Sequence, residues 1–225
     1  DTDLSDDFLT IYEPQNSQEE HKHTYVSIVT KATLKKNGSV VKKCSGCGEI
    51  ASKEVISYPK TVTLSKTSYT YNGKSQKPSV SIKGANGKKI ASSNYKVTYA
   101  SGRKNVGSYT VKITFRGNYT GTISKKFTIN PKRSTISSLS AKSGAFTAKW
   151  KKQSAQTTGY QIQYAVSSSF KNAKTVTISS SKTVSKTISR LGKKKKYYVR
   201  IRTYKTSGKT KYYSAWSKAK SVKTK

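Results

Sequence analysis

The chain has 225 residues, a net charge of +36 and 32% hydrophobic residues, a length that suits two ordinary domains. Residues 55–225 contain no Asp, Glu, His or Cys, which excludes most acid–base, metal-assisted and thiol chemistry from most of the chain. A Ser/Lys pair is the one familiar catalytic option left there, and no motif supports it, so we expect no enzymatic activity.

The positive charge gathers in that same region. It holds 38 of the 45 Lys and Arg residues, because only seven of them lie before residue 55. Lysines outnumber arginines by 39 to six, and Lys acts as a point charge, whereas Arg reads bases and phosphates with a planar fork. This balance favours unspecific attraction to polyanions over sequence-specific nucleic-acid binding.

Residues 1–20 are the acidic end of the chain. Seven of the nine carboxylates precede the first basic residue, Lys22, and the apolar residues there are confined to a short island at Phe8–Tyr12. We expect a flexible acidic leader; an acidic arm lying on the basic body stays open as the alternative. The chain has no Met, even at position 1, so we expect a processed protein or a fragment of a larger one.

Residues 21–58 predict a small His/Cys hairpin module. Two alternating runs, Tyr25–Leu34 and Ser39–Lys43, are joined by Lys36-Asn37-Gly38, and Asn-Gly is a strong hairpin signal. The second run leads directly into Cys44-Ser-Gly-Cys47-Gly48, so we expect a hairpin that ends in a CxxC turn.

Four zinc ligands are available in this module. His21 and His23 precede the hairpin, and Cys44 and Cys47 follow it, a donor set that suits a structural zinc ion. A segment this short has little apolar surface to bury and usually needs a metal, a disulfide or a partner. A Cys44–Cys47 disulfide and two free thiols stay open as alternatives. A thioredoxin-like motif does not fit, because no helical pattern follows the CxxC.

The same stretch, with His23-Thr-Tyr25, Thr30-Lys-Ala-Thr33 and Cys44 to Gly48, resembles a small His/Cys module that precedes MBG-type repeats in clostridial surface proteins.

Residues 59–131 have the pattern of a β-sandwich, with short runs separated by Gly, Asn, Ser and Pro. In the run 109–116, Tyr109, Val111, Ile113 and Phe115 share one face, and polar residues alternate with them. The segments that follow one another here are Tyr69-Thr-Tyr71-Asn-Gly-Lys74, Pro78, Asn94 to Tyr99, Asn105 to Tyr109 and Gly117 to Gly121. In this order they resemble the MBG-type bacterial Ig-like domain, which occurs in tandem on surface proteins of Gram-positive bacteria.

Within residues 133–225, Trp150 ends the run Ala145–Trp150, and Leu191 lies six residues before Tyr197. This segment resembles a fibronectin type III domain, in which a core tryptophan, a leucine and a corner tyrosine have these places. The inward positions that this resemblance implies are Tyr160, Ile162, Tyr164, Tyr197, Val199 and Ile201.

An outward face of the same domain is a candidate ligand-binding surface. Basic and aromatic residues alternate along one strand beside the Lys193–Lys196 loop, and two glutamines lie on the neighbouring strand. Such interleaving is typical of surfaces that bind sugars, nucleic acid or proteins, although ordinary exposed strand positions explain it as well. The residues are Gln161, Gln163, Tyr198, Arg200, Arg202 and Tyr204.

These features predict an all-β chain with two tandem β-sandwiches, preceded by the small module and the leader. No apolar run approaches the roughly 18 residues of a membrane helix. The resemblances imply a secreted or bacterial cell-surface protein. We expect it to be a monomer with a binding or display function. The charge favours an anionic wall polymer, an acidic glycan or a host protein as partner. An inert spacer and an unspecific nucleic-acid-binding protein stay open as alternatives.

Overall fold

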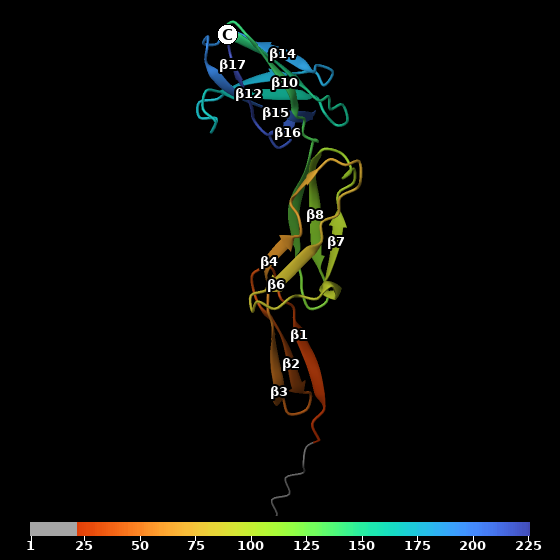
Figure 1. The fold of residues 1–225 in the computed structure, drawn as a ribbon. Helices are drawn as coiled ribbons and strands as arrows, with labels where there is room; N and C mark the ends of the chain where they lie inside the picture. The colour runs from red at the N-terminus through yellow and green to blue at the C-terminus, as the bar shows by residue number, and fades with distance from the viewer. Residues whose placement is uncertain (1–21) are drawn as a thin grey trace, which may run out of the picture.

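The computed structural model describes residues 22–225. They form three β-rich bodies that follow one another along a rod, with the start of the described chain at one end and the C-terminal domain at the other (Figure 1). The expected all-β fold is confirmed, because this part of the chain has 17 strands and one short 3-10 helix, Ser92–Asn94. No helix within residues 22–225 is long and apolar enough to cross a membrane.

The first body is a three-stranded antiparallel sheet in the order β1-β2-β3. Its strands are β1 (Tyr25–Thr30), β2 (Gly38–Cys44) and β3 (Ile50–Ile56). Every residue of β1 is exposed, and Ile28 and Val55 are 50% and 64% exposed to solvent. The two hydrophobic clusters of the described chain lie in the other two bodies, so this sheet is not held by a core of its own.

The expected hairpin that ends in the CxxC turn is confirmed, because β1 pairs with β2 antiparallel and β2 ends at Cys44. Its loop is longer than Lys36-Asn37-Gly38, because β1 ends at Thr30 and β2 begins at Gly38. Ala32, fully buried, donates its N–H to Asn118 O and accepts from Thr120 N, both at 2.9 Å. These contacts with the second body hold the loop open.

Asn37 and Gly38 have other tasks in this loop. The Asn37 side chain accepts a hydrogen bond from Tyr58 N at 2.9 Å. A Cβ at Gly38 would lie 2.1 Å from the carbonyl oxygen of Thr30, so only glycine allows this close approach. Asn37 and Gly38 therefore hold neighbouring segments of the chain together and do not form a two-residue turn.

The second body packs a two-stranded sheet against a four-stranded one. The small sheet pairs β4 (Pro59–Leu64) with β6 (Val80–Gly84). The larger one has the order β5-β9-β8-β7, with β5 (Ser68–Thr70), β7 (Tyr95–Tyr99), β8 (Gly107–Phe115) and β9 (Thr122–Asn130). Val111, Ile113 and Phe115 lie in its core, as the alternation in β8 predicts, and Tyr109 packs against them half-buried.

The third body is a sandwich of two antiparallel sheets. One contains β10 (Ile136–Lys142), β11 (Ala145–Trp150) and β14 (Ser185–Ile188). The other contains β12 (Gly159–Ala165), β13 (Lys174–Ile178), β15 (Lys196–Ser207), β16 (Thr210–Tyr213) and β17 (Lys220–Lys223). All the expected inward residues are buried in one cluster with Trp150. The hydroxyl of Tyr197 accepts a hydrogen bond from Gly192 N at 3.0 Å.

Hydrogen bonds link the second and third bodies across a short linker. The N–H of Val106 donates to Gln156 Oε1 at 3.1 Å, and the Thr203 hydroxyl donates to Lys132 O at 2.9 Å. Pro131, between the two bodies, is buried. The linker is therefore part of a packed junction, at which the rod turns from one sandwich into the next (Figure 1).

Candidate functional site

The two cysteines flank the turn between β2 and β3. Cys44 ends β2 and is buried, whereas Cys47 is exposed. The turn closes because Gly48 N donates to Cys44 O at 3.0 Å and Cys44 N donates to Glu49 O at 2.8 Å. Gly48 has a φ of +80°, a left-handed conformation that favours glycine. Across this turn the two sulfur atoms lie within 4.8 Å of each other.

His23 completes a cluster of three ligand atoms. Its Nδ1 lies 3.4 Å from Cys47 Sγ, and the ligand atoms of His23, Cys44 and Cys47 all lie within 4.8 Å of one another. Neighbouring ligand atoms of tetrahedral zinc, with bonds of about 2.0–2.3 Å, lie roughly 3.3–3.8 Å apart. The cluster therefore has the ligand types of a zinc site, and its His23–Cys47 pair has the spacing of one. The other expected ligand, His21, lies outside the described residues.

The second nitrogen of His23 faces a carboxylate. Nε2 lies 3.1 Å from Glu49 Oε2, which leaves Nδ1 directed at the thiols. A carboxylate that holds the outer nitrogen of a histidine fixes the tautomer and the ring orientation of that ligand. Stacking on Tyr25, with ring centroids 5.5 Å apart, orients the ring further. Glu49 is a residue that sequence reasoning missed; its signal is its place two residues after Cys47.

Four of the six residues expected to bind a ligand on the third body are held by one another. Strand register places Arg202 opposite Gln161 and Arg200 opposite Gln163. Arg200 Nε donates to Gln163 Oε1 at 2.7 Å. Arg202 donates to Gln161 Oε1 through both Nε and Nη2, at 2.9 and 2.7 Å.

Aromatic rings cover the flat faces of the same two guanidinium groups. Arg200 lies 4.0 Å from the ring centroid of Phe170 and 4.9 Å from that of Trp216. Arg202 lies 3.9 Å from the centroid of Tyr213 and 4.4 Å from that of Trp216. We call Phe170, Arg200, Trp216, Arg202 and Tyr213 the arginine–aromatic stack. Burial lowers the pKa of both arginines from the ordinary value.

The two remaining tyrosines of the expected face differ in exposure. Tyr198 is half-buried, with Lys196 Nζ 5.2 Å from its ring centroid. Tyr204 is only 3% exposed, so the expectation that it faces solvent is wrong. It has the outward register, but Tyr213 lies 6.1 Å away and Lys211 lies over its ring. Strand alternation predicted its direction and missed this cover.

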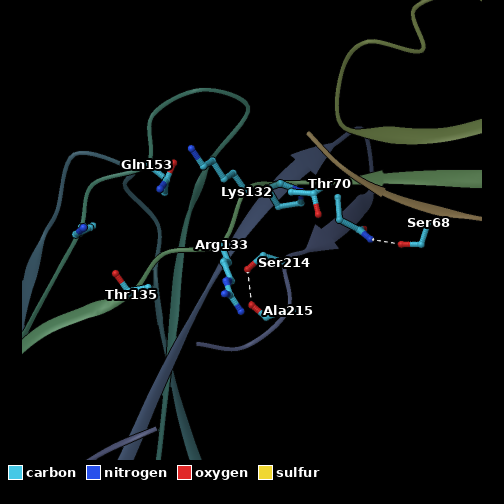
Figure 2. Close-up of a pocket in the computed structure, with 11 residues that line it drawn as sticks. Ser68, Thr70, Lys132, Arg133, Thr135, Gln153, Ser214 and Ala215 are labelled. Atoms are coloured by element: carbon cyan, nitrogen blue, oxygen red, sulfur yellow. Dashed lines mark hydrogen bonds between the residues drawn. The ribbon is translucent and has the colours of Figure 1, made fainter. Parts of the chain in front are cut away.

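A cleft of about 650 Å³ lies at the junction of the two sandwiches (Figure 2). Its lining residues come from β5 and the linker on one side and from the third body on the other: Ser68, Thr70, Asn130, Pro131, Lys132, Arg133, Thr135, Lys151, Gln153, Ser214 and Ala215. Sequence reasoning missed this site. Its signal is the pair Lys132-Arg133 directly after Pro131, in a linker too short to separate the domains.

Comparison with known families divides the chain at this junction. Residues 60–133 match the model of the MBG domain, and residues 130–220 match that of the fibronectin type III domain. A search of curated proteins finds no match to this chain.

Two multidomain crystal structures are similar to the chain at low identity. The FN1–FN3 domains of chicken CNTN1 share 14% identity over 84% of this chain and 77% of that one, with a TM-score of 0.39. Domains A168–A170 of titin share 12% identity over 88% and 82%, with a TM-score of 0.31. The family matches identify one MBG domain followed by one fibronectin type III domain within the chain.

Proposed function

We propose that this chain is a non-catalytic region of a secreted or bacterial cell-surface protein, and that it binds an anionic polymer such as a wall polymer or an acidic glycan. MBG and fibronectin type III domains are typical of surface and extracellular binding or spacer regions. The fold alone does not distinguish a binding region from a spacer, so the proposal of binding rests on the surface charge.

The observation that carries the proposal is the uncompensated charge of the two sandwiches. Residues 55–225 hold 38 basic side chains and no carboxylate side chain. Within the described part of the chain, the contact of His23 with Glu49 is the one acid–base side-chain pair within 4.0 Å. Many lysines acting together attract a polyanion because binding releases its condensed counterions.

A panel of immobilised polymers tests this proposal against its alternatives. At low salt the chain should bind poly(glycerol phosphate) and a sulfated glycan, and it should not bind neutral dextran. Tighter retention on DNA than on poly(glycerol phosphate) or the sulfated glycan would favour the alternative of an unspecific nucleic-acid-binding protein. Failure to bind any of them would favour an inert spacer. If a host immunoglobulin is added to the panel, salt-independent binding to it would overturn the counterion-release mechanism.

We expect no catalysis, because the domains of this chain are typically non-enzymatic and residues 55–225 lack every Asp, Glu, His and Cys. Assays with glycan, peptide and phosphoester substrates should show no turnover. Reproducible turnover that disappears on a point substitution would overturn this expectation.

We infer further that the first body holds one structural zinc ion, bound by Cys44, Cys47 and His23 Nδ1, with His21 as the expected fourth ligand. The size of the cluster and the lack of a core in this sheet support the inference. Two thiolates and two imidazoles form a closed site with no position for substrate, so the metal would stabilise the fold.

Elemental analysis of protein purified without added metal should find about one zinc per chain. Chelation should increase hydrogen exchange in residues 22–56 and leave both sandwiches unchanged. Glu49→Gln should weaken zinc affinity by about 10–100-fold, because it removes the carboxylate that orients His23. Glu54→Gln is the matched control. Absence of metal with a mass two hydrogens below that of the reduced chain would establish the Cys44–Cys47 disulfide instead.

A further inference from the structure

The interdomain cleft is lined by cations and neutral hydrogen-bonding groups. Lys132, Arg133 and Lys151 supply three positive charges, and the other polar side chains are hydroxyls and amides. Since the sequence has no carboxylate after Glu54, no acidic side chain of either sandwich opposes an anion there. The charge in the cleft is uniformly positive.

The guanidinium of Arg133 is uncommitted, unlike most arginines of this chain. Arg103 and Arg116 donate to backbone carbonyl groups, and Arg200 and Arg202 belong to the arginine–aromatic stack. Within residues 22–225, Arg133 has no such hydrogen bond or ring contact, a state shared only with Arg190. In Figure 2 the Arg133 side chain runs beside Ser214 and Ala215.

Neighbouring donors in the cleft are placed by the backbone. Lys151 N donates to Thr135 O at 3.0 Å, which keeps these two lining residues adjacent. Ser214 is occupied, because its hydroxyl donates to Ala215 O and accepts from Thr203 N. The side chains left to donate to a ligand include Arg133, Lys151, Thr135 and Gln153.

We propose that this cleft binds an oxyanion of the phosphate class, with Arg133 as the bidentate donor and Lys151 as its second cation. The guanidinium fork matches two phosphate oxygens, and a lysine supplies a point charge beside it. The inference deepens the proposed function and rests on it, because the oxyanion would be a group of the anionic polymer. The same chemistry would accept free inorganic phosphate.

The position of the cleft gives the bound oxyanion a structural consequence. Lining residues of the MBG domain, such as Thr70, and of the fibronectin type III domain, such as Gln153, face the same space. An anion held there contacts both domains and stiffens the junction. One phosphate group of a polymer would thus be bound in the cleft, while the lysines along the rod attract the rest of the chain unspecifically.

Titration calorimetry with two probes tests the cleft. The probes are inorganic phosphate and a short glycerol-phosphate oligomer, and the variants are the double substitutions Arg133→Gln/Lys151→Gln in the cleft and Arg190→Gln/Lys186→Gln outside it. Arg190 lines a different pocket, beside the end of β12, and Lys186 is exposed on β14. Both variants lose two positive charges, so unspecific attraction changes equally.

The cleft variant should lose about tenfold or more in affinity for the oligomer, as expected for charge-assisted hydrogen bonds, and the control should lose much less. Tighter binding of the oligomer than of inorganic phosphate identifies the polymer as the source of the oxyanion. Equal binding of the two probes identifies the free ion.

Two failures can be told apart. Equal losses in both variants would overturn the proposal that the cleft binds an oxyanion and leave the proposed function standing. If the native chain does not bind the oligomer, the proposed function fails. The oxyanion proposal is then tested by inorganic phosphate alone, and absence of phosphate binding would overturn it.

Discussion

Two sets of basic residues around the fibronectin type III domain have the same sign of charge and opposite surroundings. In the arginine–aromatic stack, Arg200 and Arg202 have aromatic rings on their faces and glutamine oxygens at their edges. In the interdomain cleft, Arg133 has none of these contacts within the described chain and opens onto a cavity. The arginines of the first set form their hydrogen bonds inside the domain, whereas the guanidinium of Arg133 is left to donate to a ligand.

This contrast indicates that an alternation of basic and aromatic residues along a strand does not by itself predict which side chains are left to contact a ligand. The outer face of β15 has that alternation, yet its arginines are partly desolvated, which lowers the pKa of each. Removal of a stack residue should therefore reduce stability, and removal of a cleft residue should reduce binding. The following substitutions test that separation.

The largest effect is expected for Trp216→Ala. Trp216 lies over both arginines, so its removal loses two cation–π contacts and the apolar area of the ring. The free energy of unfolding of the fibronectin type III domain should fall by about 2–4 kcal/mol. Urea denaturation measures this, with Lys218→Ala as the nearby exposed control. A change no larger than that of the control would show that the stack does not stabilise the domain.

A smaller effect is expected for Arg202→Lys, which keeps the charge and removes the planar fork. The two hydrogen bonds to Gln161 and the stacking between Tyr213 and Trp216 would be lost. The free energy of unfolding should fall by about 1–2 kcal/mol. The same measurement on Arg133→Lys should show no comparable loss. Equal effects of the two substitutions would contradict the claim that Arg202 stabilises the domain and Arg133 does not.

The smallest effect on stability is expected for Arg133→Gln. Its side chain makes no contact that the fold depends on, so the free energy of unfolding should change by less than about 0.5 kcal/mol. Phosphate affinity should nevertheless fall. A loss of stability as large as that of Arg202→Lys would show that Arg133 serves the domain junction rather than a ligand.

The sequence predicts the sandwiches better than the sites. Trp150, Tyr160 and Tyr197 lie in the core, as expected, because alternation and spacing reflect the burial of one strand face. The prediction that Gln161 lies on the strand next to that of Arg202 is confirmed, because the two residues pair across β12 and β15. Trp216, however, lies in a loop after β16, and strand periodicity carries no information about a loop residue that folds back over the sheet.

The errors have tertiary causes. The predicted hairpin forms, but its loop is longer than Lys36-Asn37-Gly38, because Ala32 forms hydrogen bonds with the MBG domain. Tyr204 has the outward register and is nevertheless covered by residues of β16. The cleft joins β5 to residues more than 60 positions later, a contact that depends on how two domains meet and has no local pattern.

The salt dependence of polymer binding tests the central claim most directly. Affinity for poly(glycerol phosphate) should fall linearly on logarithmic axes as salt rises, because the basic surface releases counterions. If six to ten contacts form, the loss should be about 10³ to 10⁵-fold between roughly 50 and 200 mM salt, by analogy with nucleic acid. Binding whose affinity does not change over that range would contradict the claim that the uncompensated charge of the two sandwiches recognises an anionic polymer.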